Sequence, residues 1–356
     1  MPCPVTCSAR RRNSVAVSAK LSRISIASLK GRNNEGILTL VIAGILILMF
    51  LIAPEQVSLT FFGDIIRSGI VTMSLALGLL LVIISGGMDV SFTAIAVFSG
   101  YCVVLFMQRL GIDGAVWPFF AAAAIGACLG VLNAVLVAKY QMETLVATLG
   151  TQVVIRGVLL AFIGSTYLAT LPPRLDSVGQ LSLFKLGNSP VNVTVLVVLG
   201  CALLIAWVLS RTTFGRSIYA VGGSKEASRR VGINVKRVQV GIYVIAGLLA
   251  GLGGMVHVAL SRHASPFELV GTEMTVIAAV VIGGALDSGG RGSVKGTILG
   301  VLLISLTQNS LVRLGVSSYW QTLVVGFVIL MGVVVQAKST VLSIRRPQIL
   351  EEVGEK

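Results

Sequence analysis

The stretch that most constrains the fold is RTTFGRSIYAVGGSKEASRRVGINVKRVQ, residues 211–239, which lies between two long apolar runs. It carries seven Lys or Arg residues and a single acid, Glu226. Short loops rich in Lys and Arg stay on the cytoplasmic side of membrane proteins. These residues therefore predict a cytoplasmic loop between two membrane spans.

The composition of the whole chain is that of a membrane protein. Hydrophobic residues make up 55% of the 356 residues and charged residues only 12%, about half of the ~25% typical of soluble domains. The net charge of +14 is concentrated in the N-terminal tail and in breaks between apolar runs. Positive-inside topology and contact with anionic membrane lipid explain that distribution, so we expect no nucleic-acid partner.

Cysteine and histidine usage predicts neither a disulfide framework nor a metal site. The five cysteines are odd in number, and Cys102, Cys128 and Cys201 fall inside apolar runs, as small buried side chains do. The two histidines, His257 and His263, are too few for a metal cluster.

Apolar runs predict an all-α polytopic transmembrane helical bundle of about ten spans. The runs cover residues 37–53, 65–84, 91–107, 115–137, 145–163, 193–209, 240–260, 274–286, 297–312 and 319–336. Six precede the basic loop and four follow it, so both termini and the loop are expected on the cytoplasmic side. The eighth run is short and ends in Gly283-Gly284, which suits a discontinuous half-helix; an ordinary helix end is the alternative.

The predicted domain organisation is simple. A basic cytoplasmic tail covers residues 1–36, one membrane domain covers 37–336 and includes the 211–239 loop, and a cytoplasmic tail covers 337–356. The longest predicted external loop, residues 164–192, is too short for an independent domain of about 50 residues or more.

Within the basic loop, residues 224–230 (SKEASRR) consist of good helix formers and predict a short helix. Gly232 is placed to end it in a left-handed conformation. Glu226 and Arg230 lie four residues apart and can pair along one side. The simpler alternative is an ordinary positive-inside loop without a partner.

The sequence FGRSIYAVGGSKEASRRVGI, residues 214–233, closely resembles the coupling loop of ribose/galactose-type permeases. These are membrane subunits of ATP-driven (ABC) sugar importers, and they are related to branched-chain amino-acid permeases. The resemblance implies that this segment docks into a groove of an ATPase subunit. The matching positions are Gly215, Arg216, Ala220, Gly222, Gly223, Glu226, Ala227, Gly232 and Ile233.

Three further stretches carry the same resemblance over most of residues 65–335. They are LLVIISGGMDVSFTAIAVFSG from Leu80, GVLNAVLVAKYQMETLVATLGTQVVIRG from Gly130, and the segment from Ala264 to Gln336. They supply candidates for a translocation pathway, namely Asp89, Ser91, Asn133, Thr148, Thr151, Arg156, Glu268 and Asn309.

Two of these candidates have simpler alternative interpretations. Arg156 lies near a span centre, where an arginine costs roughly 2.5–3.5 kcal/mol on insertion scales, so we expect it to face a polar cavity or a buried partner. The alternative is an interfacial arginine that extends toward water. Asp89 follows Gly86-Gly87, and its alternative is a tight turn capped at the start of the next span.

The sequence departs from the family pattern at three places. Val90 and the segment 92–94 differ from the commoner signature, and Asn309-Ser310-Leu311 stands where the family usually has Asn-Gly-Leu. The resemblance therefore determines the fold better than it determines the solute.

Catalytic motifs are missing from the sequence. The nearest imitation of a phosphate-binding loop, residues 289–296 (GGRGSVKG), lacks the Gly-Lys-Ser/Thr ending. We therefore expect no catalytic residues, metal or cofactor in this chain, with ATP bound by a partner.

The resemblance implies a permease of the bacterial inner membrane that translocates a small sugar. Its implied partners are two ATPase subunits, a second permease copy or a homologous permease, and a periplasmic sugar-binding protein. Within the same class, the alternatives are a permease for branched-chain amino acids or for another small solute. From other classes, the alternatives are an ion-coupled secondary transporter and, after it, a membrane-embedded enzyme. Secondary transporters usually place acids or bases inside spans, whereas the acids here cluster at span ends, with Asp89 the best exception.

Overall fold

The computed structural model describes residues 35–317, 319–328 and 330. The predicted tails, residues 1–36 and 337–356, lie outside the described residues apart from residues 35–36. The end of the tenth predicted run also lies outside them.

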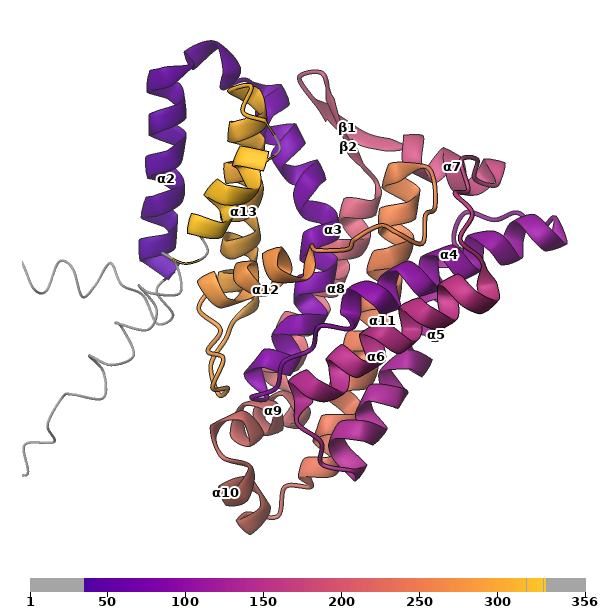
Figure 1. Cartoon of the computed structure of the whole chain (residues 1–356). Coiled ribbons are helices and arrows are strands. Elements are labelled where there is room, and N and C mark those ends of the chain that lie inside the picture. Colours follow the sequence, from indigo (N-terminus) through magenta and orange to yellow (C-terminus); the bar gives the residue numbers. More distant parts are fainter. Residues whose placement is uncertain (1–34, 318, 329, 331–356) are drawn as a thin grey trace, which may run out of the picture.

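The described part of the chain is mainly helical (Figure 1), and the predicted all-α membrane bundle is confirmed. Eight of its helices are long and apolar enough to cross a membrane. They are α2 (Glu35–Ile52), α3 (Leu59–Ile84), α4 (Phe92–Leu110), α5 with the π-helical turn η2 (Trp117–Lys139), α6 with the π-helical turn η3 (Thr144–Ile163), α8 (Thr194–Arg211), α11 (Val235–Ser261) and α13 (Val294–Arg313). Two shorter apolar helices, α12 (Glu273–Ile282) and Tyr319–Val328, match the eighth and tenth predicted runs.

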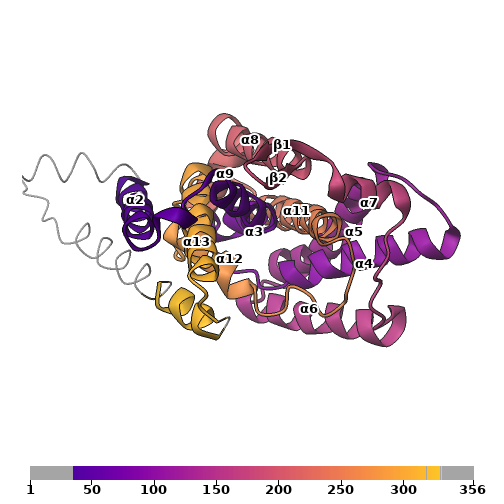
Figure 2. The same cartoon turned by 90° about the horizontal axis from the view of Figure 1, so that it is seen from above.

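Two long helices, α3 and α11, form the centre of the bundle. Both are mostly buried by the other helices, whereas α2 lies at the periphery (Figure 2). Close contact between α5 and α11 depends on glycine, because a side chain on Gly126 would overlap the carbonyl oxygen of Gly247. Small residues of this kind let helix backbones approach in lipid. Gly126 and Gly130 on α5 and Gly247 and Gly251 on α11, each pair spaced four residues apart, therefore serve helix packing.

The bundle has two distinct ends, which we name by the elements found there (Figure 1). The hairpin end carries the short helix α7 (Pro173–Gln180) and the antiparallel strands β1 (Ser182–Leu186) and β2 (Ser189–Asn192). The α10 end carries α9 (Thr213–Gly223) and α10 (Lys225–Arg230). The 3-10 turn η1 (Pro54–Gln56) joins α2 to α3.

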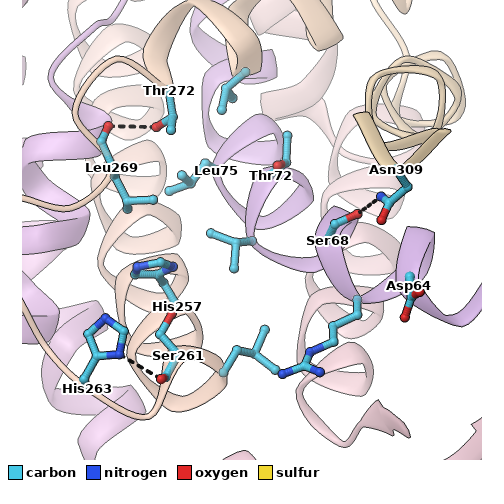
Figure 3. A pocket seen from close by; sticks show the side chains of 14 residues that line it. Asp64, Ser68, Thr72, Leu75, His257, Ser261, His263, Leu269, Thr272 and Asn309 are labelled. Atoms are coloured by element: carbon cyan, nitrogen blue, oxygen red, sulfur yellow. Dashed lines mark hydrogen bonds between the residues drawn. The ribbon is translucent and has the colours of Figure 1, made fainter. Parts of the chain in front are cut away.

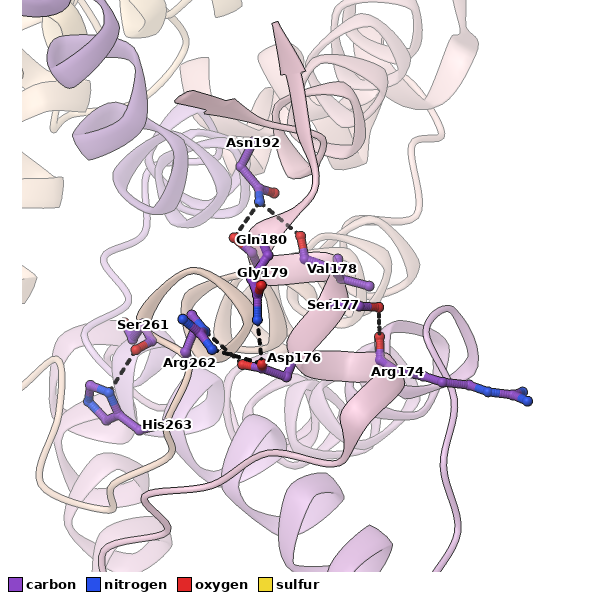
Figure 4. Close-up of polar contacts among 10 residues, drawn as sticks. All are labelled: Arg174, Asp176, Ser177, Val178, Gly179, Gln180, Asn192, Ser261, Arg262 and His263. Carbon is purple, nitrogen blue, oxygen red and sulfur yellow. Dashed lines mark hydrogen bonds and ion pairs between the residues drawn. The ribbon is translucent and has the colours of Figure 1, made fainter. Parts of the chain in front are cut away.

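The segment at the hairpin end is attached to the end of α11 by an ion pair and is held together by hydrogen bonds of its own (Figure 4). Arg262 donates from Nε and Nη2 to the two carboxylate oxygens of Asp176, at 2.7 and 2.8 Å. The Asn192 amide donates to the carbonyls of Val178 and Gly179, at 2.9 Å each. The longest predicted external loop is therefore a folded cap over this end of the bundle.

The predicted polar break at residues 211–239 contains more helix than the sequence indicated. A single short helix was expected there, but α9 precedes α10, and Gly222 and Gly223 form the last turn of α9. The α9 helix begins where the Thr212 hydroxyl accepts a hydrogen bond from the Gly215 N–H at 3.0 Å. Its buried positions, Gly215, Ile218 and Val221, recur every three residues. This apolar stripe is narrow and lies among basic and polar residues, so the helix was not predicted from the sequence.

Candidate coupling and translocation sites

The short helix α10 lies within the predicted segment 224–230 and begins one residue later than predicted, since Ser224 is its N-cap. The Ser224 hydroxyl accepts a hydrogen bond from the Ala227 N–H at 3.2 Å, which caps the helix start. Gly232 adopts the left-handed conformation, with φ of +85°, just beyond the helix end. Glu226 and Arg230 pair at 2.9 Å, and both side chains are exposed.

The predicted docking positions differ in their accessibility. Five of them are exposed: Arg216, Gly223, Glu226, Ala227 and Gly232. Gly215 and Gly222 instead pack against neighbouring backbone, so their lack of a side chain is required inside this chain. Ala220 and Ile233 are half-buried. The exposed surface of α10 is therefore the part available to a partner.

Three chain breaks meet at the end of α9, the element that precedes α10. We call this contact the glycine junction; it is formed by Ile84, Tyr219, Gly222, Gly290 and Gly292. A side chain on Gly222 would overlap the Ile84 carbonyl oxygen, which accepts a hydrogen bond from the Gly290 N–H at 2.8 Å. The Tyr219 hydroxyl donates to the Gly292 carbonyl at 2.9 Å. The junction therefore joins α9 to the end of α3 and to the loop between α12 and α13.

A buried polar cluster surrounds the break between α3 and α4. One carboxylate oxygen of Asp89 accepts from the N–H and the hydroxyl of Ser91, at 2.8 and 2.7 Å. The Asn133 amide donates to the same Ser91 hydroxyl at 2.7 Å. Thr148 accepts from the Val90 N–H at 3.3 Å. The local interpretation of Asp89 as a turn cap matches this geometry, and its carboxylate is also buried, at 2% exposure.

Arg156 has the buried partner that its position in a span required. Its Nη2 donates to Oε1 of Glu273 at 2.7 Å. The same carboxylate oxygen accepts from the Thr93 hydroxyl at 2.7 Å and from the Gln152 amide at 2.9 Å. This ion pair connects α4, α6 and the first turn of α12. Thr151, on the same helix as Arg156, donates to the Thr148 carbonyl at 3.1 Å.

Glu273 was not among the candidates that the sequence indicated. Two signals were available: Glu273 immediately precedes the eighth apolar run, and a buried arginine needs a counter-charge. An acid in a first turn also suits the helix dipole, so this signal did not by itself indicate a partner.

A cavity of about 690 Å³ opens among α3, α11, α13 and the loop that precedes α12 (Figure 3). Its polar lining includes Asp64, Ser68, Thr72, His257, His263 and Asn309. The Asn309 amide donates to the Ser68 hydroxyl at 2.8 Å. The Ser189 hydroxyl on β2 donates to Asp64 at 2.7 Å, which places the cavity toward the hairpin end.

Glu268 lies beside this cavity and is held by two imidazoles. Its Oε2 is 2.6 Å from Nε2 of His257, and its Oε1 bonds to Nε2 of His263. Burial raises the pKa of Glu268, but the hydrogen bonds and charges of the imidazoles outweigh burial, so the pKa lies below its ordinary value. The three side chains bond to one another, and the described residues contain no group placed to hold a metal ion.

Comparison with known proteins identifies the family. A family model described as "Branched-chain amino acid transport system / permease component" matches residues 61–333. The chain belongs to this permease family. With its eight candidate spanning helices, this permease is a multi-pass inner-membrane protein. No solved structure gives a significant match.

The permease is also similar to curated importers. It is 35% identical over 291 residues to the ribose import permease protein RbsC of Escherichia coli (strain K12), covering 81% of this chain and 88% of that one. It is 35% identical over 281 residues to RbsC of Bacillus subtilis (strain 168), covering 78% and 84%. It is 32% identical over 305 residues to the autoinducer 2 import system permease protein LsrC of Yersinia pseudotuberculosis (serotype O:3, strain YPIII), covering 85% and 84%.

The candidate pathway residues of the permease fall into two separate groups. Asp89, Ser91, Asn133, Thr148, Thr151 and Arg156 lie around the α3–α4 break and the ion pair, whereas Glu268 and Asn309 lie at the cavity. Family membership favours the permease interpretation over an ion-coupled carrier or a membrane enzyme.

Proposed function

We propose that this chain is the membrane-spanning subunit of an ATP-driven importer for a small sugar. A periplasmic binding protein delivers the sugar, and two separate ATPase subunits bind at the α10 end. A second permease copy or a homologous permease completes the membrane part. The similarity to the ribose and autoinducer 2 permeases supports this class of solute.

One structural observation carries the proposal: an exposed, capped helix is connected by backbone contacts to breaks inside the membrane domain. The α10 helix follows α9 after one residue, and α9 ends at the glycine junction. At this junction Gly222 contacts the end of α3, and Gly290 bonds to the same carbonyl. Backbone has no rotamers with which to absorb a displacement. A push on α10 therefore reaches the α3–α4 break directly.

The two groups of pathway candidates then act in sequence. The cavity near the hairpin end receives the solute, and the polar cluster around Asp89 lies deeper in the bundle, next to the Arg156–Glu273 ion pair. Polar side chains and irregular backbone at membrane depth are tolerated where they line a pathway. Contacts to the solute should be few, since the solute must leave again.

The docking of α10 is tested by enlarging its smallest exposed side chain. Ala227→Arg should leave membrane abundance normal, because α10 lies outside the apolar spans. It should abolish co-purification of the ATPase and ATP-dependent uptake, since a bulky cation prevents close approach of the helix backbone. Ala227→Ser is the matched control and should behave as the wild type.

A second variant tests the helix end. Gly232→Val should resemble Ala227→Arg, because a β-branched residue at φ of +85° is strained. If Ala227→Arg protein still bound the ATPase and imported solute normally, the coupling assignment would be wrong, and an ion-driven carrier would become the better hypothesis.

A further inference from the structure

We propose that the cavity at the hairpin end binds the transported solute through Arg67. We further propose that it selects a polyhydroxylated solute with one negative charge, such as a sugar carboxylate. This inference rests on the proposed function, because it takes the cavity as the entry to the import pathway. Arg67 was not among the pathway candidates indicated by the sequence.

The carboxylates around the cavity are already engaged by other side chains. Asp64 pairs with Nη2 of Arg313 at 2.7 Å and also accepts from the Ser189 hydroxyl. Glu268 is bonded to both His257 and His263. Both carboxylates therefore already have hydrogen-bond partners, and neither of them contacts Arg67.

Arg67 is a basic residue of the cavity lining that takes part in none of these contacts. It lies on α3 in the cavity wall, its side chain is exposed, and it forms no hydrogen bond or ion pair with any other described residue. A guanidinium presents five N–H donors in a fixed plane that matches a carboxylate. A charge within a membrane span is costly and commonly marks a substrate pathway. The cavity is thus suited to an anionic group.

The rest of the lining suits hydroxyl groups. The side-chain hydroxyls of Thr72 and Ser261 line the cavity (Figure 3) and have no hydrogen-bond partner among the described residues. The Asn309 amide uses its N–H groups on Ser68 and on the Ser305 carbonyl, so its oxygen remains available to accept. A volume of about 690 Å³ lies within the usual range for small-molecule sites.

The test is direct binding to the full-length permease in lipid nanodiscs, measured by saturation-transfer NMR. The probes are ribonate, ribose and leucine. Ribonate and ribose are both polyhydroxylated and differ in net charge, whereas leucine is a zwitterion of zero net charge that has a carboxylate and no hydroxyl group. We expect wild-type protein to bind ribonate at least about tenfold more tightly than either of the other two, as one charge-assisted hydrogen bond provides.

Two arginine variants locate the preference. Arg67→Gln should remove the tenfold advantage of ribonate and leave ribose binding unchanged, since glutamine keeps the polarity and loses the charge. Arg174→Gln is the matched control, because Arg174 is an exposed arginine on α7 outside the cavity lining (Figure 4). It should retain the wild-type preference. Membrane abundance and thermal unfolding confirm that each variant is folded.

The inference is overturned if wild-type protein binds ribose or leucine as tightly as ribonate, if it binds none of the three in the millimolar range, or if Arg67→Gln keeps the preference. These outcomes differ from failure of the proposed function. If the assembled transporter still imports a neutral sugar with ATP hydrolysis, only the charge selectivity is lost. If ATP-dependent uptake is absent for every sugar, the importer assignment itself fails.

Discussion

Replacing Arg156 by Leu isolates the ion pair that joins α6 to α12. The variant leaves Glu273, only 6% exposed, with two neutral donors, Thr93 and Gln152. Removing one partner of a buried pair costs about 3–5 kcal/mol, because the other charge remains unpaired. The Arg156 side chain is 25% exposed, so we expect the lower end, about 3 kcal/mol, which is roughly a hundredfold change in an equilibrium constant.

The measurements are membrane abundance, thermal unfolding and solute uptake. We expect Arg156→Leu to insert at normal abundance, to unfold at lower temperature and to lose uptake, since α12 no longer keeps its place beside α6. Gln152→Leu is the internal control. It removes one neutral hydrogen bond to the same oxygen and should cost only about 1 kcal/mol.

A double-mutant cycle separates the ion pair from other effects of the substitution. Arg156→Leu combined with Glu273→Leu removes both charges and should be more stable than either single variant, since no unpaired charge remains. Additive losses in the double variant would refute the coupling. Unchanged uptake in Arg156→Leu would refute the functional role and favour an arginine that merely extends toward water.

Other features of the structure give independent predictions. Reporter fusions in α10 and at Gly187 should report opposite sides of the membrane, and the same side for both would contradict the ten-span topology. The leucine side chain of Gly126→Leu would overlap the α11 backbone, so this variant should lower the free energy of unfolding by about 3 kcal/mol and reduce the yield of folded protein. Gly150→Leu is its control, because no atom lies within 4 Å of a side chain added there. Arg262 lowers the pKa of Asp176 through their hydrogen bonds, so the pair stabilises the cap above the ordinary pKa of a free Asp and loses this effect as pH falls through the lowered value. Thermal unfolding of Arg262→Gln should therefore differ from that of the wild type at neutral pH and converge with it in acid.

The helices of the membrane domain were predictable from the sequence. Each of the ten predicted apolar runs overlaps, within the described residues, an apolar helix. Their boundaries were less certain, since α3 begins at Leu59, six residues before its predicted start. The ends of α10 were also predictable, because Ser224 and Gly232 act on backbone only a few residues away.

The candidate site was only partly predictable. The sequence indicated that Arg156 needs a partner, but not that the partner is Glu273, 117 residues further along the chain. The sequence indicated Glu268 as a candidate, but not its contacts with His257 and His263. It did not indicate Arg67 as a candidate. The apolar stripe of α9 was concealed by neighbouring charges, and so the glycine junction was missed.

The sequence by itself determined which segments are helical and, through the distribution of Lys and Arg, the predicted orientation. Lipid offers backbone groups no hydrogen-bond partners, so an apolar run of sufficient length must satisfy them within its own helix. Only the tertiary structure decided which polar side chains meet. Helix faces toward lipid and toward other helices are both apolar, so hydropathy does not specify the rotation or depth of a helix. Close contacts such as that between Gly126 and Gly247 set the position of one helix against another, and only the packed bundle shows that Arg156 on α6 meets Glu273 on α12.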